Sequence, residues 1–199
     1  MKLNLGLRGN SMQTAVKIPE NLKLTYEDYL LLPEGKRYEI IDGELFMTPS
    51  PRTVHQRLVV KLFRIIDDFV KKKRLGEVFI APYDVILSKH DIVQPDIVFI
   101  SKQRSSIITE LNVQGSPELA VEILSPSNKE IDLILKKKLY AAFGIKEYWI
   151  VNPAHKSVKL FNLGKTGYME AKTGNILKSF VLKGLEIDIS GLFEDVIKH

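Results

Sequence analysis

Two acidic residues stand in segments that are otherwise apolar, and their setting suggests metal chemistry. Glu122 lies within the run 118–124 (ELAVEIL), and Asp96 directly precedes the run 97–100 (IVFI). A carboxylate in an apolar strand is costly unless it is paired, protonated or bound to a metal. Because adjacent strands lie about 4.8 Å apart, two such carboxylates can share one Mg²⁺ or Mn²⁺ ion, whose remaining ligands would be waters and substrate phosphates. We therefore predict that Asp96 and Glu122 are metal ligands.

A lysine after the Glu122 strand can supply the third element of such a site. Asp132, Lys136 and Tyr140 follow at positions i, i+4 and i+8, so they share one stripe of a predicted helix. The Lys136 ammonium can hold an attacking water or stabilise charge in a transition state, with Asp132 and Tyr140 orienting it. The alternative is an ordinary ion pair between Asp132 and Lys136 on a helix face.

The helix that carries Lys136 has recognisable ends. Ser127 and Glu130, three residues apart, are typical of a capping box at its beginning. Gly144 is the expected C-terminal cap, because glycine readily adopts the left-handed conformation found there.

The rest of the pattern predicts a mixed order of helices and strands. Thr25 is the expected N-cap of a short helix, Asp42-Gly43 the turn of a hairpin over residues 37–48, and apolar spacing makes residues 54–72 the strongest helix. Expected strands cover residues 77–87, 92–101, 118–124 and 147–151, followed by short antiparallel strands at 157–161, near 168, at 180–182 and at 185–189. This order indicates an α/β or α+β fold, a mixed β-sheet flanked by helices with a β-rich C-terminal extension.

Composition limits the class of protein further. The chain has 199 residues, 45% of them hydrophobic, and we expect residues 1–20 to form a flexible extension and residues 21–199 a single domain. The absence of cysteine excludes disulfides, thiolate metal sites and cysteine nucleophiles. No apolar run approaches the roughly 18 residues of a membrane span, and no secretion signal is recognisable, so we expect a cytoplasmic protein. The net charge of +5 suits a polyanion but is also common among ordinary soluble proteins.

Together these residues resemble the PD-(D/E)XK superfamily of restriction-type nucleases. Pro95-Asp96 matches the first half of its pattern and Glu122 the second acid, but Leu124 stands where the superfamily usually has its lysine. Several branches of that superfamily move the lysine to the following helix, and Lys136 is the matching residue here.

The wider sequence is similar to one branch, the Uma-type bacterial restriction endonucleases, over residues 25–160. The matching positions are YEIIDGEL at 38–45, Pro49-Ser50-Pro51, His55, Pro95-Asp96, VEILSPS at 121–127, Asp132, Lys136, Tyr140, Gly144 and EYWIVNP at 147–153. This resemblance implies a restriction-endonuclease-like fold and Mg²⁺- or Mn²⁺-dependent cleavage of DNA. Symmetric cutting of both strands would require a homodimer.

The resemblance also raises the question of a further acid, which the superfamily often places near its first helix. Glu44 is our candidate catalytic residue and Glu39 the alternative. Asp84 can line the same cleft, although we do not count it among the site residues. His55 is expected either to contact phosphate or to position Glu44, unless it is an ordinary residue at a helix start.

Other features keep several functions open. The basic run at residues 71–74 is either a phosphate contact or a solvated helix end, and Tyr148 and Trp149 are expected to be core aromatics rather than a platform for bases. A metal-dependent endonuclease is the first hypothesis. A catalytically silent binding or regulatory module of the same fold is the second, because fold alone does not fix function. A phosphatase is the weakest, since no phosphate-cradling glycine loop is present.

Overall fold

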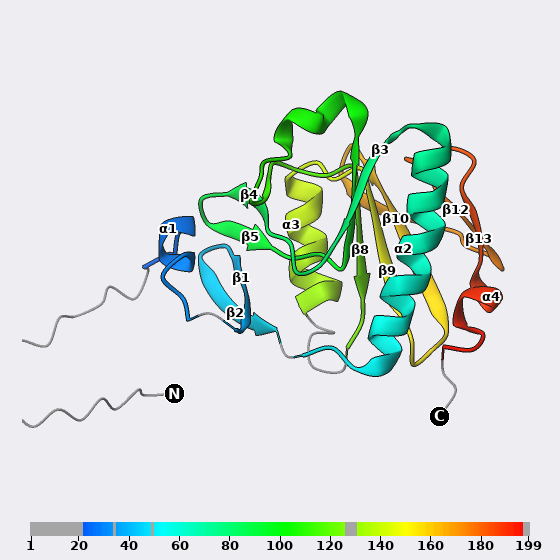
Figure 1. Cartoon of the computed structure of the whole chain (residues 1–199), viewed down its shortest axis with the longest axis horizontal. Helices are drawn as coiled ribbons and strands as arrows, with labels where there is room; N and C mark the ends of the chain where they lie inside the picture. Colours follow the sequence, from blue (N-terminus) through cyan, green and yellow to red (C-terminus); the bar gives the residue numbers. More distant parts are fainter. Residues whose placement is uncertain (1–21, 34, 49, 126–130, 197–199) are drawn as a thin grey trace, which may run out of the picture.

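The structure is a computed structural model that describes residues 22–33, 35–48, 50–125 and 131–196 (Figure 1). It contains mixed β-sheets flanked by helices, which confirms the predicted fold class. The predicted extension at residues 1–20 and the predicted capping box of Ser127 and Glu130 lie outside the described residues, and so does the side chain of Asp132.

The larger sheet has six strands in the order β11-β10-β9-β8-β6-β3. Only β8 and β9 run parallel to each other, and the other neighbours in this sheet are antiparallel. Its strands are β3 (Gly76–Ile80), β6 (Ile97–Ser101), β8 (Leu119–Ile123), β9 (Glu147–Asn152), β10 (Ser157–Gly164) and β11 (Gly167–Ala171).

A second sheet has five strands in the order β2-β1-β5-β4-β7, and a ribbon of two strands pairs β12 with β13. The members of the second sheet are β1 (Arg37–Ile41), β2 (Glu44–Thr48), β4 (Val85–Ser88), β5 (Asp91–Val93) and β7 (Val113–Gln114), and the ribbon consists of β12 (Ile176–Lys178) and β13 (Glu186–Asp188). The predicted hairpin is confirmed, since β1 and β2 turn at Asp42 and Gly43, whose φ angles of 51° and 78° are those a tight hairpin turn requires.

The helices differ greatly in length. They are α1 (Tyr26–Tyr29), α2 (Thr53–Lys73), the 3₁₀ turn η1 (Lys102–Ile107), the π-helical segment η2 (Ile131–Lys136), α3 (Lys137–Ala142) that continues it, and α4 (Ile189–Phe193). The predicted caps are present: the Thr25 side chain accepts a hydrogen bond from the Asp28 N–H, and Gly144 follows α3 with a φ of 76°. Among the described residues, no helix combines the length and the apolar character needed to cross a membrane.

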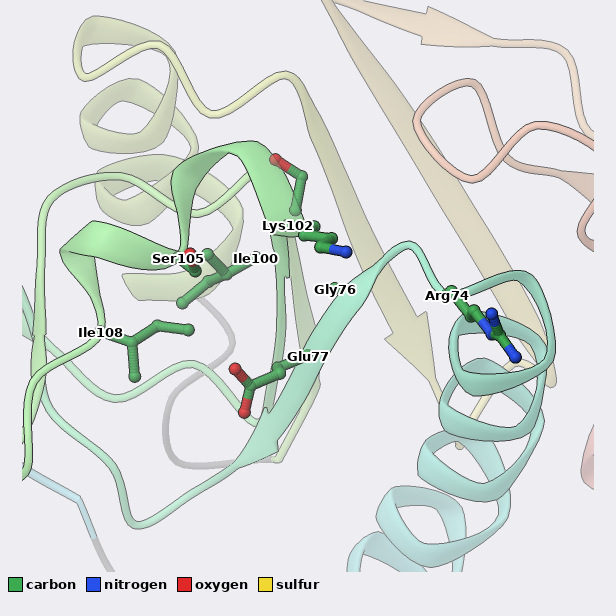
Figure 2. Close-up of a pocket in the computed structure, with 8 residues that line it drawn as sticks. Arg74, Gly76, Glu77, Ile100, Lys102, Ser105 and Ile108 are labelled. Carbon is green, nitrogen blue, oxygen red and sulfur yellow. The ribbon is translucent and has the colours of Figure 1, made fainter.

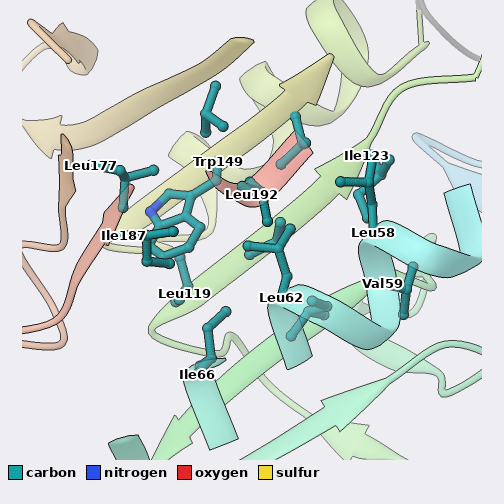
Figure 3. Packing of buried hydrophobic residues seen from close by; sticks show 14 of the residues in the cluster. Leu58, Val59, Leu62, Ile66, Leu119, Ile123, Trp149, Leu177, Ile187 and Leu192 are labelled. Atoms are coloured by element: carbon teal, nitrogen blue, oxygen red, sulfur yellow. The ribbon is translucent and has the colours of Figure 1, made fainter. Parts of the chain in front are cut away.

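The six-stranded sheet is buried on both faces, which explains why its central strands read as nearly continuous apolar runs. Side chains alternate between the faces: in β8, Leu119, Val121 and Ile123 pack in the core beneath α2, whereas Ala120 packs on the side of α3. Figure 3 shows the first of these cores, where Leu58, Leu62 and Ile66 of α2 lie over the sheet near Trp149. Glu122 therefore belongs to the face that α3 covers (Figure 1).

Two predicted strands are each divided between the two sheets. The stretch 77–87 forms β3 in one sheet and β4 in the other, and the stretch 92–101 forms β5 and β6 with residues 94–96 between them. Each crossing contains a proline, Pro82 or Pro95, but apolar residues on both sides of it read as one strand, so the sequence pattern alone did not reveal the break. Asp96 consequently lies in a connection between sheets and not within a strand. The strand expected at 180–182 is also wrong, because the chain pairs at β12 instead.

Candidate active site

Glu122 is held in a polar cluster beneath the η2–α3 helix. Its Oε1 atom accepts hydrogen bonds from the Tyr140 hydroxyl at 2.7 Å and from Lys136 Nζ at 2.9 Å. All three side chains are buried, and the residues Glu122 and Lys136 are each only 3% exposed. The predicted stripe of Lys136 and Tyr140 thus faces the predicted acid.

A second carboxylate holds Lys136 from the opposite side. Glu39 Oε1, from β1, lies 2.9 Å from Lys136 Nζ, and the same oxygen accepts the Gln94 N–H at 2.7 Å. Lys136 therefore bridges two buried glutamates and is itself buried, whereas the Asp132 side chain of the alternative ion pair lies outside the described residues. Breaking a buried pair of this kind by removing one partner is strongly destabilising.

Asp96, in the connection between β5 and β6, adjoins the cluster through the backbone of β8. Its Oδ2 atom accepts the N–H of Ile123 at 2.8 Å, and Ile123 is the residue directly after Glu122. The Nε2 atom of His55, in the first turn of α2, lies 3.0 Å from the same oxygen. The two predicted acids are thus on adjoining segments, with Asp96 bonded to the backbone of the Glu122 strand.

Burial changes the acid–base behaviour of the cluster. The pKa of Tyr140 is raised well above its ordinary value, first by desolvation and then by the negative charges of Glu122 and Glu39. Its hydroxyl therefore stays protonated and serves as a hydrogen-bond donor to Glu122.

A further layer of hydrogen bonds connects the cluster to the N-terminal segment. Gln94, whose N–H bonds Glu39, also donates through Nε2 to Asp84 Oδ1 at 2.7 Å, and the Tyr29 hydroxyl donates to the same Asp84 oxygen at 2.8 Å. Arg37 Nε donates to Gln94 Oε1 at 3.1 Å. Asp84 is therefore connected to the cluster through Gln94. Asp84 was named from the sequence as a residue that can line the cleft, whereas the parts played by Gln94, Tyr29 and Arg37 were not predicted.

Glu44 does not occupy the place predicted for it. It is exposed at the start of β2, where its charge adds to that of Asp42 and Asp91 around Lys23. Glu39 and Glu44 lie on the same face of the hairpin, but Glu44 follows the turn directly whereas Glu39 lies two residues further inside, against β5. The structure thus favours Glu39, the alternative acid. It also gives His55 a different partner, since His55 bonds Asp96 and not Glu44.

The buried carboxylates are the residues here that could hold a divalent cation. Glu39 and Glu122 are buried carboxylates that contact the Lys136 ammonium, and Asp96 is a further buried carboxylate, bonded to the backbone N–H of Ile123 beside Glu122. Carboxylate oxygens are the ligands that Mg²⁺ and Mn²⁺ use in proteins. In the described ranges no group of three or more histidine, aspartate or glutamate side chains is arranged to hold a metal by itself. These residues allow a Mg²⁺ site made of two carboxylates, waters and phosphate oxygens, which is the usual environment of this ion.

Other candidate features lie away from the cluster. The basic run at residues 71–74 is at the far end of α2, about 24 Å from His55 at 1.5 Å per residue. A pocket of about 340 Å³ lies beside the Ser101 end of β6, the end opposite Asp96, and includes Arg74, Ile100 and Lys102 (Figure 2). Tyr148 and Trp149 are fully buried, as expected of core aromatics.

Comparisons with known proteins agree with this architecture. The family model described as "Uma2: Putative restriction endonuclease" matches residues 26–190. Among solved structures, one described as "a putative nuclease belonging to DUF820" from Anabaena variabilis superposes with a TM-score of 0.74 at 19% sequence identity, covering 87% of this chain and 99% of that one. At this level of identity, the likeness establishes the fold. Among curated proteins, none matches the chain significantly.

Proposed function

The chain belongs to the Uma2 family, and from that premise we propose that it is a Mg²⁺- or Mn²⁺-dependent endonuclease that hydrolyses phosphodiester bonds in DNA. The observation that carries the proposal is that Glu122, Glu39 and Lys136 form one buried cluster, while the buried Asp96 carboxylate bonds the N–H of Ile123, the residue next to Glu122. Such a collection of charged groups is expensive to bury and is typical of functional sites.

Each residue of the cluster has a distinct part in the proposed reaction. Asp96 and Glu122 would hold the metal, which when bound lowers the pKa of a water and neutralises charge on the phosphate. Lys136 keeps Glu122 and Glu39 in place and stabilises the negative charge that develops at the phosphate. Tyr140 fixes the orientation of the Glu122 carboxylate through its hydroxyl.

Cleavage of supercoiled plasmid DNA with Mg²⁺ or Mn²⁺ tests the proposal. Asp96→Asn and Glu122→Gln keep the shape of each side chain, and each should lower the cleavage rate by at least about 100-fold. Glu118→Gln is the matched control, because Glu118 is equally buried at the other end of β8 but bonds Ser101 instead of the cluster. Circular dichroism should show all three variants folded. Equal cleavage by wild type and both cluster variants would refute the assignment.

A catalytically silent module of the same fold is the second candidate. The observation that favours it is Leu124, which stands where the superfamily usually has its lysine. Titration calorimetry with MnCl₂ separates the two functions from one another: absence of Mn²⁺ binding at millimolar concentration, together with absence of cleavage, would favour the module. A homodimer, which symmetric cutting of both strands requires, and a location in the cytoplasm remain parts of the proposal.

A further inference from the structure

His55, in the first turn of α2, contacts the Asp96 carboxylate through its ring. Its Nε2 atom lies 3.0 Å from Asp96 Oδ2, and the side chains of His55 and Asp96 are 11% and 8% exposed. We propose that His55 is a positioning residue that fixes the Asp96 carboxylate for metal binding. This inference rests on the proposed function, because it takes Asp96 to be a metal ligand.

The position of Asp96 in the chain explains why it requires such a partner. Asp96 precedes β6 in the connection between the two sheets, so it is not among the paired residues of the strand ladder. Its carboxylate is held by two donors from different elements, the His55 ring on α2 and the Ile123 N–H on β8. Two donors that converge on one oxygen restrict rotation of the carboxylate, whereas the Ile123 N–H alone would leave it freer to turn.

The surroundings of the other ring nitrogen, Nδ1, support a role for His55 through its Nε2 contact with Asp96. Within the described part of the chain, His55 Nδ1 is buried and has no hydrogen-bond partner. In the proposed role Nε2 carries the proton, so that the ring donates and the Asp96 carboxylate accepts. An apolar side chain of similar size would avoid leaving a nitrogen unpaired in the interior, but it would lack the donor that Asp96 receives.

Binding of Mn²⁺ to the full chain, measured by titration calorimetry, tests this role without relying on cleavage. His55→Phe retains bulk but removes the donor, and its Mn²⁺ affinity should fall about 10–100-fold, the usual cost of losing a residue that orients a metal ligand. His55→Gln can place an N–H near the position of Nε2 and should lose less than about tenfold. His90→Phe is the matched control, since the His90 ring bonds the Leu24 carbonyl and no member of the cluster, and its affinity should equal that of wild type.

Each result bears on the inference. Equal Mn²⁺ affinity in wild type, His55→Phe and His55→Gln would overturn it while leaving the proposed function intact. Failure of wild type to bind Mn²⁺ would overturn both. If thermal unfolding shows that His55→Phe does not fold, His55→Asn takes its place. Its amide is too short to reach Asp96, so it should bind Mn²⁺ more weakly than His55→Gln, and equal affinities of these two would overturn the inference.

Discussion

Two buried glutamates on neighbouring parallel strands behave very differently. Glu122 on β8 is bonded to an ammonium and a hydroxyl from the next helix, and Lys136 connects it to Glu39. Glu147 on β9 is also buried, but its partners are the Trp149 indole, the Ser179 hydroxyl and the Val181 N–H. Burial of a carboxylate is common to both sites, whereas the collection of several charges is found only around Glu122. The latter is therefore the feature that points to catalysis.

The Glu147 contacts serve the fold. They connect the beginning of β9 to the turn between β12 and β13, with the Val181 N–H at 2.6 Å and the Ser179 hydroxyl at 3.1 Å. Desolvation raises the pKa of Glu147, and the hydrogen bonds it accepts oppose that rise only in part. Neutral donors of this kind can satisfy a buried carboxyl group without a counter-ion.

Removal of the Lys136 ammonium should have the largest effect on stability and on cleavage. Lys136→Met leaves Glu39 and Glu122 facing one another without their ammonium, which should cost about 3–5 kcal/mol of stability and lower cleavage by about 100–10,000-fold. Because a bound cation would replace part of the lost charge, MnCl₂ should raise the melting temperature of this variant more than that of wild type. Thermal unfolding with and without MnCl₂ measures this. A melting temperature equal to that of wild type would contradict the cluster as described.

The two hairpin glutamates provide a smaller and sharper test. Glu39→Gln should reduce metal-dependent cleavage about 10–100-fold, because it weakens the hold on Lys136. Glu44→Gln should leave the rate within about twofold of wild type, since substitutions of exposed residues usually have small effects. Plasmid cleavage at equal folded concentration compares them. The reverse order would mean that Glu44, and not Glu39, serves the site.

The smallest effect is expected at Glu147 and concerns stability alone. Glu147→Gln should cost about 1–3 kcal/mol at pH 5, because the amide offers its donors to groups that also donate, and cleavage by the folded protein should not change. A raised folded-state pKa contributes stability that is complete below the unfolded pKa and is lost as pH rises through the folded pKa. The advantage of wild type over the variant should therefore shrink as the pH rises above 4.5, the ordinary pKa of a glutamate. Urea unfolding at several pH values measures it, and an advantage that grows with pH would show the pKa to be lowered.

Much of the fold followed from local patterns. Apolar spacing located α2 and the central strands, and cap residues such as Thr25 and Gly144 located the helix ends. The exchange of strands between two sheets did not follow, because apolar residues stand on both sides of the crossings at residues 81–84 and 94–96 and read as single strands. Alternation reports which side of a strand is buried, but not which sheet buries it.

The sequence by itself marked Asp96 and Glu122, because a charge within an apolar run is anomalous wherever the run is placed, and it aligned Lys136 with Tyr140, because helical spacing is local. Only the tertiary structure decided that Glu39 rather than Glu44 meets Lys136, and that His55 meets Asp96. Depth within the protein depends on what packs over a residue, and the elements that cover the hairpin and α2 come from distant parts of the chain. Contacts of that kind arise from packing, which no local spacing of residues encodes.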